Sequence, residues 1–442
     1  MRRIFATYLF MEIPMKQRPT GLVLATSLVM TGLFAFALSG CGGGTGSDPA
    51  LDSAGVATAV QLRAVPAPAP PAPPPNSAAL QALGQAIFND PNMSTPPGTA
   101  CASCHQPATG FSGLNGSTLG VAKGSLPSSF GLRNPSQAAY SAQNPPFGFV
   151  TTPQGNQIPS GGLFWDGRVN TLAQQALLPL LNPVEMNNQN SNAVVAKVAA
   201  ANYAKQFTAL FGATAFGNPD QAFIQIGQAI QAFESAGPFE AFSSKFDAVI
   251  QAKASFTVAE RNGLALFQDP RNGCAGCHRL NAASSNPNDS PFTNSNYIVE
   301  GIPRNTKIPS NAVASFFDLG LCGPERTTPT APAGVNISEY CGAFQVPSLR
   351  NVALRKFYMH NGFFTNLTDV VTFYSTRNSN PQHWYGPSGI PNDLPAQYQI
   401  NLEKRKPPFD RSASAGPLLT TAQIGEVVAF LNTLSDGYQP GN

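Results

Sequence analysis

The chain contains two five-residue words, CASCH at residues 101–105 and CAGCH at residues 274–278. Each places a histidine directly after a Cys-x-x-Cys pair, although the 442 residues include only four histidines and seven cysteines. Two thiols one helical turn apart, followed by a histidine, are typical of covalent attachment of a c-type haem. The thiols add to the two haem vinyl groups, and the histidine then lies beneath the iron as its proximal ligand.

Two other kinds of site use Cys-x-x-Cys pairs. The pairs could pool into one four-cysteine zinc site, but zinc ribbons space their pairs more closely and need no histidine after each. A thioredoxin-like redox pair needs a βαβ setting, which neither word has. The sequence therefore predicts two c-type haems, bound by Cys101, Cys104 and His105 and by Cys274, Cys277 and His278.

The segments before the two words are similar to each other. Each is a short amphipathic stretch that ends in Phe-x-Asp-Pro, at residues 88–91 and 267–270. Residues 257–260 (TVAE) form a capping-box pattern that predicts a helix start before the second word. Apolar residues spaced along 421–434 predict a closing helix that packs across that start helix. We expect an all-α fold of two tandem cytochrome c-like haem domains, residues 78–255 and 256–442.

Composition limits the classes of partner. Only 11% of the residues are charged, and there are 40 glycines and 41 prolines, which favours long connections around compact helical pieces. The formal net charge of +3 is too small to indicate binding to nucleic acid or to an anionic membrane.

Residues 1–40 are predicted to be a lipoprotein signal peptide. Basic residues precede an apolar run from Leu22 to Leu38, which ends in LSGC at residues 38–41. Cleavage of such a signal leaves a lipidated N-terminal cysteine, here Cys41, followed by a Gly- and Pro-rich linker over residues 41–77. We therefore expect a periplasmic protein whose membrane contact is a lipid anchor. An uncleaved membrane helix over the same run is the alternative.

Four further words lie around the two haem words: LFWDGR (163–168), QQALLPLLNPVEM (174–186), VPSLRNVAL (346–354) and YMHNG (358–362). In this order they resemble the di-haem cytochrome c peroxidase family, which includes the MauG-type enzymes. The resemblance covers residues 78–438. It implies a peroxidatic first haem domain and an electron-transfer second one. It also implies reduction of hydrogen peroxide with electrons from a small cytochrome c or cupredoxin.

The first haem is expected to have an open coordination position. In many members of the family, a second histidine from the segment after the first haem word also binds this iron. Residues 106–164 contain neither histidine nor methionine. The sequence therefore predicts a five-coordinate iron, bound by His105 alone, that reacts with peroxide without prior reduction.

Three residues are candidates for the reaction itself. Glu185 matches the family position that moves a proton between the peroxide oxygens, although a carboxylate that follows Pro183 is also common at a helix start. Gln175 matches a pocket residue that hydrogen-bonds bound peroxide, and Pro179 and Pro183 are expected to bend the chain between the two. Trp165 matches a relay between the haems, although tryptophan is more often simply buried.

The second haem has two candidates for its sixth ligand. Family members usually place a methionine fourteen residues after the histidine of Y-x-H-x-G. Counted from His360, that position is Tyr374, and the MauG-type enzyme also has tyrosine there. A phenolate favours oxidised iron and lowers the reduction potential. Met359 is the competing ligand, and Tyr374 is favoured.

The resemblance also implies a calcium ion, bound by the Asn134 side chain and by the main-chain carbonyls of Arg355 and Phe357. Independently of the resemblance, Cys322 and Cys341 flank a Pro- and Thr-rich loop. In an oxidising compartment we expect them to form a disulfide, with free buried thiols as the alternative.

Three functions follow from these patterns. The first is a di-haem peroxidase. The second is a MauG-like enzyme that oxidises aromatic residues of a partner protein, which Tyr374 and the absence of a distal histidine favour. The third is a di-haem electron carrier, which requires two six-coordinate irons.

Overall fold

The computed structural model describes residues 77–439. The predicted signal peptide (1–40), lipidation of Cys41 and nearly all of the linker (41–77) lie outside the described residues. Among the residues that are described, no helix is long and apolar enough to cross a membrane.

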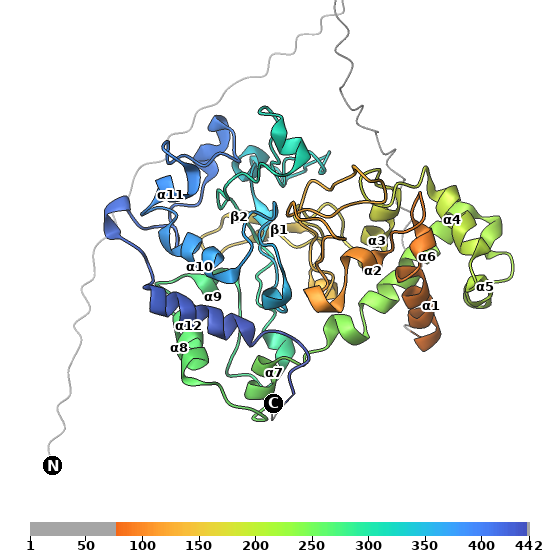
Figure 1. Cartoon of the computed structure of the whole chain (residues 1–442), viewed down its shortest axis with the longest axis horizontal. Coiled ribbons are helices and arrows are strands. Elements are labelled where there is room, and N and C mark those ends of the chain that lie inside the picture. The colour runs from red at the N-terminus through yellow and green to blue at the C-terminus, as the bar shows by residue number, and fades with distance from the viewer. Residues whose placement is uncertain (1–76, 440–442) are drawn as a thin grey trace, which may run out of the picture. The chain divides into compact units, whose positions relative to one another are not determined.

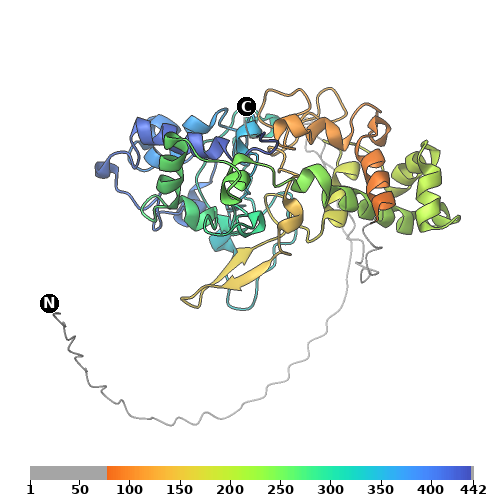
Figure 2. The same cartoon turned by 90° about the horizontal axis from the view of Figure 1, so that it is seen from below.

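Twelve α-helices, eleven short 3-10 helices and two small sheets make up the regular structure of residues 77–439, which confirms the all-α class. Each sheet is one antiparallel pair, β1 (Gly148–Thr151) with β2 (Gln157–Ser160) and β3 (Tyr297–Ile298) with β4 (Phe344–Gln345). Figure 2 shows the β1–β2 hairpin projecting away from the helices. The helices before residue 240 are α1 (Ala78–Phe88), α2 (Cys101–Cys104), α3 (Leu172–Leu181), α4 (Ser191–Ala200), α5 (Ala204–Phe211) and α6 (Pro219–Glu234). Those after it are α7 (Lys245–Ile250), α8 (Val258–Gln268), α9 (Cys274–Cys277), α10 (Leu367–Thr376), α11 (Pro381–Tyr385) and α12 (Thr421–Asn432).

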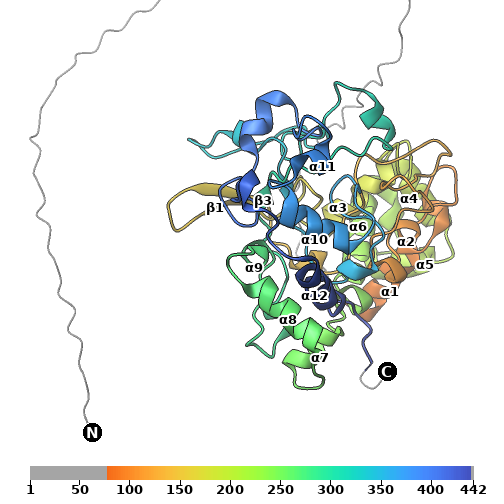
Figure 3. The same ribbon diagram turned by 60° about the vertical axis from the view of Figure 1, so that its left-hand side comes forward.

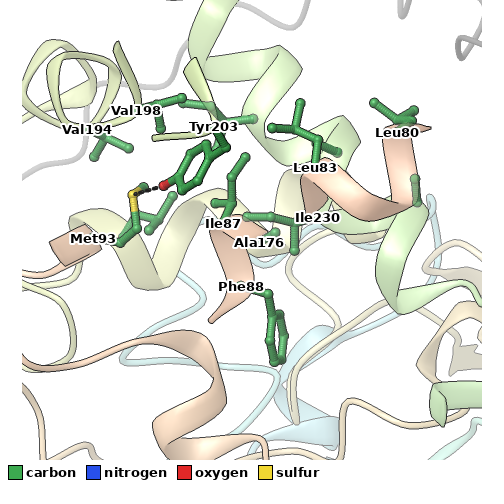
Figure 4. Packing of buried hydrophobic residues seen from close by; sticks show 14 of the residues in the cluster. Leu80, Leu83, Ile87, Phe88, Met93, Ala176, Val194, Val198, Tyr203 and Ile230 are labelled. Atoms are coloured by element: carbon green, nitrogen blue, oxygen red, sulfur yellow. Dashed lines mark hydrogen bonds between the residues drawn. The ribbon is translucent and has the colours of Figure 1, made fainter. Parts of the chain in front are cut away.

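Two large apolar clusters lie on either side of the sheets (Figure 1). The N-terminal cluster joins α1, α3, α4, α5 and α6 through buried aliphatic and aromatic side chains (Figure 4), and the Tyr203 hydroxyl approaches the Met93 sulfur at 3.7 Å. The C-terminal cluster joins α7, α8, α10 and α12. The chain passes from the first cluster to the second between Phe239 and Phe246. The predicted domain boundary at residue 255 stays a prediction.

The repeat seen in the sequence recurs in the packing. The helix before each haem word crosses a second helix at a glycine: α1 contacts α6 at Gly84, and α8 contacts α12 at Gly263. A Cβ atom at either glycine would lie 1.9 Å from a carbonyl oxygen of the crossing helix, that of Ala229 or Glu426. The Thr257 hydroxyl caps α8 as the sequence predicts. Only glycine allows this approach of two backbones.

A buried ion network connects distant loops near the sheets. Arg133 donates to Asp166 at 2.7 Å and to Asp318 at 2.6 Å, and Arg168 contacts Asp166 and Glu325. Burial would raise the pKa of Asp166, but Arg133 and Arg168 outweigh it and hold this pKa below its usual value. The network therefore fixes residues 166–168, beside Trp165, against the loop over residues 318–325.

Replacing Gly263 with Ala should destabilise the protein, because the new Cβ forces α8 and α12 apart. We expect the free energy of unfolding to fall by about 1–3 kcal/mol. Gly425→Ala on α12 is the matched control, since its Cβ meets nothing within 4 Å. That control should stabilise the helix by up to about 1 kcal/mol. Urea unfolding of the two holoproteins measures both, and equal effects would contradict the close helix crossing.

Candidate active site

The first haem word forms the single-turn helix α2, and its histidine follows directly. His105 Nδ1 lies 2.8 Å from the Phe111 carbonyl oxygen. Because a carbonyl can only accept, Nδ1 carries the proton and Nε2 is left free to bind a metal. Burial lowers the pKa of His105, which keeps the imidazole neutral. Cys101 and Cys104 are free thiols, one turn apart, as haem attachment requires.

Glu185 lies close to this first word. After burial, its carboxylate is the second cause of the raised pKa of Cys104, which is about 12. Burial and the neighbouring Glu325 raise the pKa of Glu185 itself to about 7. The Ser125 amide donates to the Glu185 carbonyl at 2.7 Å, so the loop that carries the carboxylate is fixed in place. A carboxyl group with a pKa near 7 can both accept and return a proton at neutral pH.

Gln175 lies within α3, and Glu185 lies beyond the end of this helix. The expected change of direction between them is present at Pro183, because the chain leaves the helical path at Asn182, immediately before this proline. The helix α3 continues through Pro179 to Leu181, so the bend expected at Pro179 itself stays a prediction.

The second haem word forms α9 at the wall of a cavity of about 1640 Å³. His278 Nδ1 lies 3.0 Å from the Phe292 carbonyl oxygen, and burial lowers the pKa of His278 to about 4. Cys274, Cys277 and His278 all line the cavity. Figure 3 shows α9 close to α10 and α12. This word therefore repeats the geometry of the first one.

Both candidates for the sixth ligand of the second haem line the same cavity. Tyr374 projects from α10, and its hydroxyl donates to Glu300 Oε1 at 2.7 Å. Burial and the charge of Glu300 raise the pKa of Tyr374, and Cys277 and Cys274 add smaller contributions. Met359 comes from an irregular segment at φ 68°. The preference for Tyr374 stays a prediction.

Trp165 lines the cavity at the second haem word, and its predicted place as a relay between the haems stays a prediction. Its Nε1 donates to the Asn134 carbonyl at 2.7 Å, and its indole meets the His360 ring edge-on with 6.5 Å between centroids. His360 in turn stacks on Phe344 at 3.6 Å. Trp165, Phe344 and His360 all line the cavity at the second word. A row of aromatic rings therefore leads from Trp165 into that cavity.

A buried cation that has no carboxylate partner among residues 77–439 tests whether a haem fits here. Arg355 is buried, lines the cavity at the second word and lowers the pKa of His105 at the first. Burial lowers the pKa of Arg355 to about 10, and within the part of the chain that the structure describes its guanidinium donates only to the Phe357 and Pro135 carbonyls. A buried guanidinium needs an anion. Haem propionates would supply it between the two words.

The predicted calcium site has a suitable set of oxygens. The Asn134 amide nitrogen donates to the carbonyls of Phe357 at 3.0 Å and Met359 at 3.2 Å, while Asn134 Oδ1 is buried and has no hydrogen-bond partner among the described residues. The Arg355 carbonyl accepts the Tyr358 hydroxyl instead. With its side-chain amide rotated, Asn134 would present an oxygen beside two carbonyl oxygens, which is the donor type that calcium prefers.

The remaining cysteines and histidines lie apart from the first haem word. Cys322 and Cys341 form the expected disulfide, with 5.1 Å between their Cα atoms. Over residues 77–439, no group of three or more His, Cys, Asp or Glu side chains is arranged to hold a metal ion, so the two thiol pairs do not pool into one zinc site. His383 is exposed on α11.

Sequence reasoning missed two side chains of this region. Glu300 lies in a loop without a motif, and only the fold brings it to Tyr374. The sequence predicts only a main-chain carbonyl role for Arg355. A pair of basic residues at 355–356, shortly before the Y-x-H-x-G word in a chain with few charges, is the signal that could have identified its side chain.

Comparisons with known proteins agree with this arrangement. A sequence model of the di-haem cytochrome c peroxidase family matches residues 78–255. The methylamine utilization protein MauG of Paracoccus denitrificans is 34% identical over 374 residues, 83% of this chain and 91% of that protein. Cytochrome c551 peroxidase of Nitrosomonas europaea is 27% identical over 83% of this chain and 82% of its own. The crystal structure of the diheme peroxidase BthA from Burkholderia thailandensis superposes with a TM-score of 0.75 at 35% identity, covering 81% of this chain and 86% of that one.

Replacing the true sixth ligand should change the spectrum of the second haem alone. We expect Tyr374→Phe to alter its absorption and electron paramagnetic resonance signals, because the iron loses a phenolate donor. Met359→Leu should leave them unchanged. The signals of the first haem and the haem content by mass serve as internal controls. A change with Met359→Leu and none with Tyr374→Phe would reverse the assignment.

Proposed function

Because the chain belongs to the di-haem cytochrome c peroxidase family, we propose that it reduces hydrogen peroxide to water with electrons from a small redox protein. The family is enzymatic and implies two covalently bound c-type haems, one for each Cys-x-x-Cys-His word. A role as an electron carrier alone is therefore set aside. The relatives carry names of both peroxidases and MauG proteins, so the reaction itself is our proposal.

The observation that carries the proposal is the position of Glu185. Its carboxyl group has a pKa of about 7 and acts electrostatically on the thiols of the first haem word. The segment over residues 106–164, which supplies a second ligand in many family members, has no histidine or methionine. The two histidines outside the haem words, His360 and His383, lie in the C-terminal half of the chain.

Bound haem supplies the iron at which peroxide is reduced. In this scheme the Glu185 carboxylate accepts the proton of one peroxide oxygen and returns it to the other, so that water can leave. Gln175 orients the peroxide by hydrogen bonding. Trp165 would act as the relay between the haems, and its hydrogen bond to the Asn134 carbonyl, which fixes the plane of the indole, supports this role.

Two features complete the proposal. Calcium would be bound by Asn134 and neighbouring carbonyls, which the unpartnered Asn134 Oδ1 supports. The chain would be exported and attached to the membrane through lipidated Cys41, as the N-terminal pattern predicts.

A MauG-like reaction, in which an aromatic side chain of a partner protein is oxidised, is the second candidate. The observation that favours it is Tyr374 at the second cavity, hydrogen-bonded to Glu300. An anionic ligand would help the second haem to share in an oxidised state. Consumption of peroxide with a reduced cytochrome as the electron source distinguishes the two, because only the first function requires such a donor.

Glu185→Gln should lower kcat by about 10²- to 10⁴-fold, the range typical of lost general acid–base catalysis. In the wild type, kcat/KM should fall as the pH drops below about 7, because protonated Glu185 cannot accept a proton. In the Glu185→Gln variant, kcat/KM should no longer fall below about pH 7, and the mass of the protein should still show two bound haems. Glu325→Gln removes the negative charge that raises the pKa of Glu185, so the fall in kcat/KM should move to lower pH. Unchanged turnover in Glu185→Gln would exclude this role.

The resting oxidised protein should contain one high-spin haem. His105 alone binds the first iron in this proposal, so cyanide or azide should bind there without prior reduction. Electron paramagnetic resonance and titration with cyanide measure this directly. Two low-spin haems that do not bind cyanide would contradict the open position.

A further inference from the structure

A row of basic side chains lies at the rim of the second cavity. Lys404, Arg405 and Lys406 are consecutive and exposed, and Arg405 and Lys406 line the cavity. Lys406 is close enough to Cys277 to lower its pKa, against the opposing effects of burial and Glu300. We call residues 404–406 the basic edge. It therefore adjoins the thiol that anchors the second haem.

The charge of the basic edge is not neutralised within the described residues. None of its three side chains forms an ion pair there, whereas Arg271 nearby is paired with Asp269. The acidic neighbour Glu403 accepts hydrogen bonds from the Arg405 and Lys406 main-chain amides, at 2.8 and 3.2 Å. Its carboxylate therefore orders the turn, and the side chains of the basic edge still project their charge into solvent.

The basic edge is held on both sides by buried contacts. The Glu403 amide donates to the Val299 carbonyl at 3.0 Å, and Arg377 donates to the Glu403 carbonyl. On the other side, Phe409 is buried beneath the Arg377 guanidinium, 3.7 Å from its ring centroid. The surface is therefore formed before any partner arrives, which lowers the entropic cost of binding.

An exposed apolar side chain accompanies the charge. Ile400 is 88% exposed, the highest value among the large hydrophobic side chains of the described residues, and it lines the same cavity. The neighbouring Asn401 side chain donates to the Ser338 and Cys341 carbonyls, which fixes Ile400 in place. A small apolar centre beside a charged rim suits a transient interface, where charge governs the rate of encounter.

We propose that the basic edge and Ile400 form the docking surface for a small redox protein with a strongly acidic face, which donates electrons to the second haem. This inference rests on the proposed peroxidase function and adds the charge of the donor. Two reduced donor molecules each lose one electron, and hydrogen peroxide with two protons becomes two molecules of water. An anionic membrane could also attract the basic edge. The position at the rim of the haem cavity favours an electron donor.

The test uses the full-length holoenzyme and two reduced probes of opposite charge. Plant plastocyanin is an acidic cupredoxin, and mitochondrial cytochrome c is basic. We expect kcat/KM for plastocyanin at low salt to exceed that for cytochrome c at least tenfold and to fall steeply as ionic strength rises. Lys404→Glu/Arg405→Glu should lower the value for plastocyanin at least tenfold and flatten its salt dependence.

Lys205→Glu/Lys253→Glu is the matched control. It makes the same change in net charge at exposed side chains on α5 and just after α7, which do not line the cavity. The control should react with plastocyanin at the wild-type rate. Peroxide reduction with hydroquinone, a neutral small reductant, reports the peroxidase function without docking and should be equal in all three proteins.

The outcomes separate the two proposals. If the wild type did not reduce peroxide with hydroquinone, the proposed peroxidase function would be overturned. Normal hydroquinone activity with an equal loss of plastocyanin activity in both charge-reversed proteins would overturn docking at the basic edge. Faster reaction of the wild type with cytochrome c would overturn an acidic donor. Weaker binding of the Lys404→Glu/Arg405→Glu protein to phosphatidylglycerol vesicles, with unchanged plastocyanin kinetics, would assign the basic edge to the membrane.

Discussion

Two hydrogen bonds from imidazole to the backbone govern the rest of the structure. Each haem word forms only one helical turn, which is too short to be stable alone. Its histidine acquires a fixed ring plane and tautomer because Nδ1 donates to a carbonyl, that of Phe111 or Phe292. Those carbonyls belong to loops packed against the two helix crossings.

The region between the two words combines charge with aromatic rings. Arg133 and its carboxylates fix the backbone around Trp165, while Asn134 fixes the indole itself. The stack of His360 on Phe344 extends this row toward the second cavity. Fixed distances between these rings would suit the proposed relay role of Trp165, because a shift of the His360 ring would change its distance to Trp165 and its distance to Phe344. The buried cation Arg355 adds a positive charge to the cavity at the second word, where a haem propionate would pair with it.

Much of the fold could be predicted from local patterns, because the haem words, the capping box at Thr257 and the apolar spacing of α12 act within a few residues of one another. The packing of α1 on α6 was missed, since no motif marks α6 as a closing helix. Of the two prolines expected to bend the chain after Gln175, Pro183 follows directly after the end of α3, whereas the helix continues through Pro179. Glu300 and Arg355 depend on tertiary proximity to Tyr374 and to both haem words. The spacing of residues along the sequence does not predict these tertiary contacts.

The disulfide between Cys322 and Cys341 has a consequence for maturation. Four cysteines must remain reduced until they react with vinyl groups, while two others in the same chain must be oxidised. A Cys-x-x-Cys pair itself closes readily into a local disulfide. Assembly therefore needs an order of events. The two Cys-x-x-Cys pairs must stay reduced until they bond to the haem, although the Cys322–Cys341 disulfide forms in the same chain. Early oxidation would instead join cysteines that should bind haem.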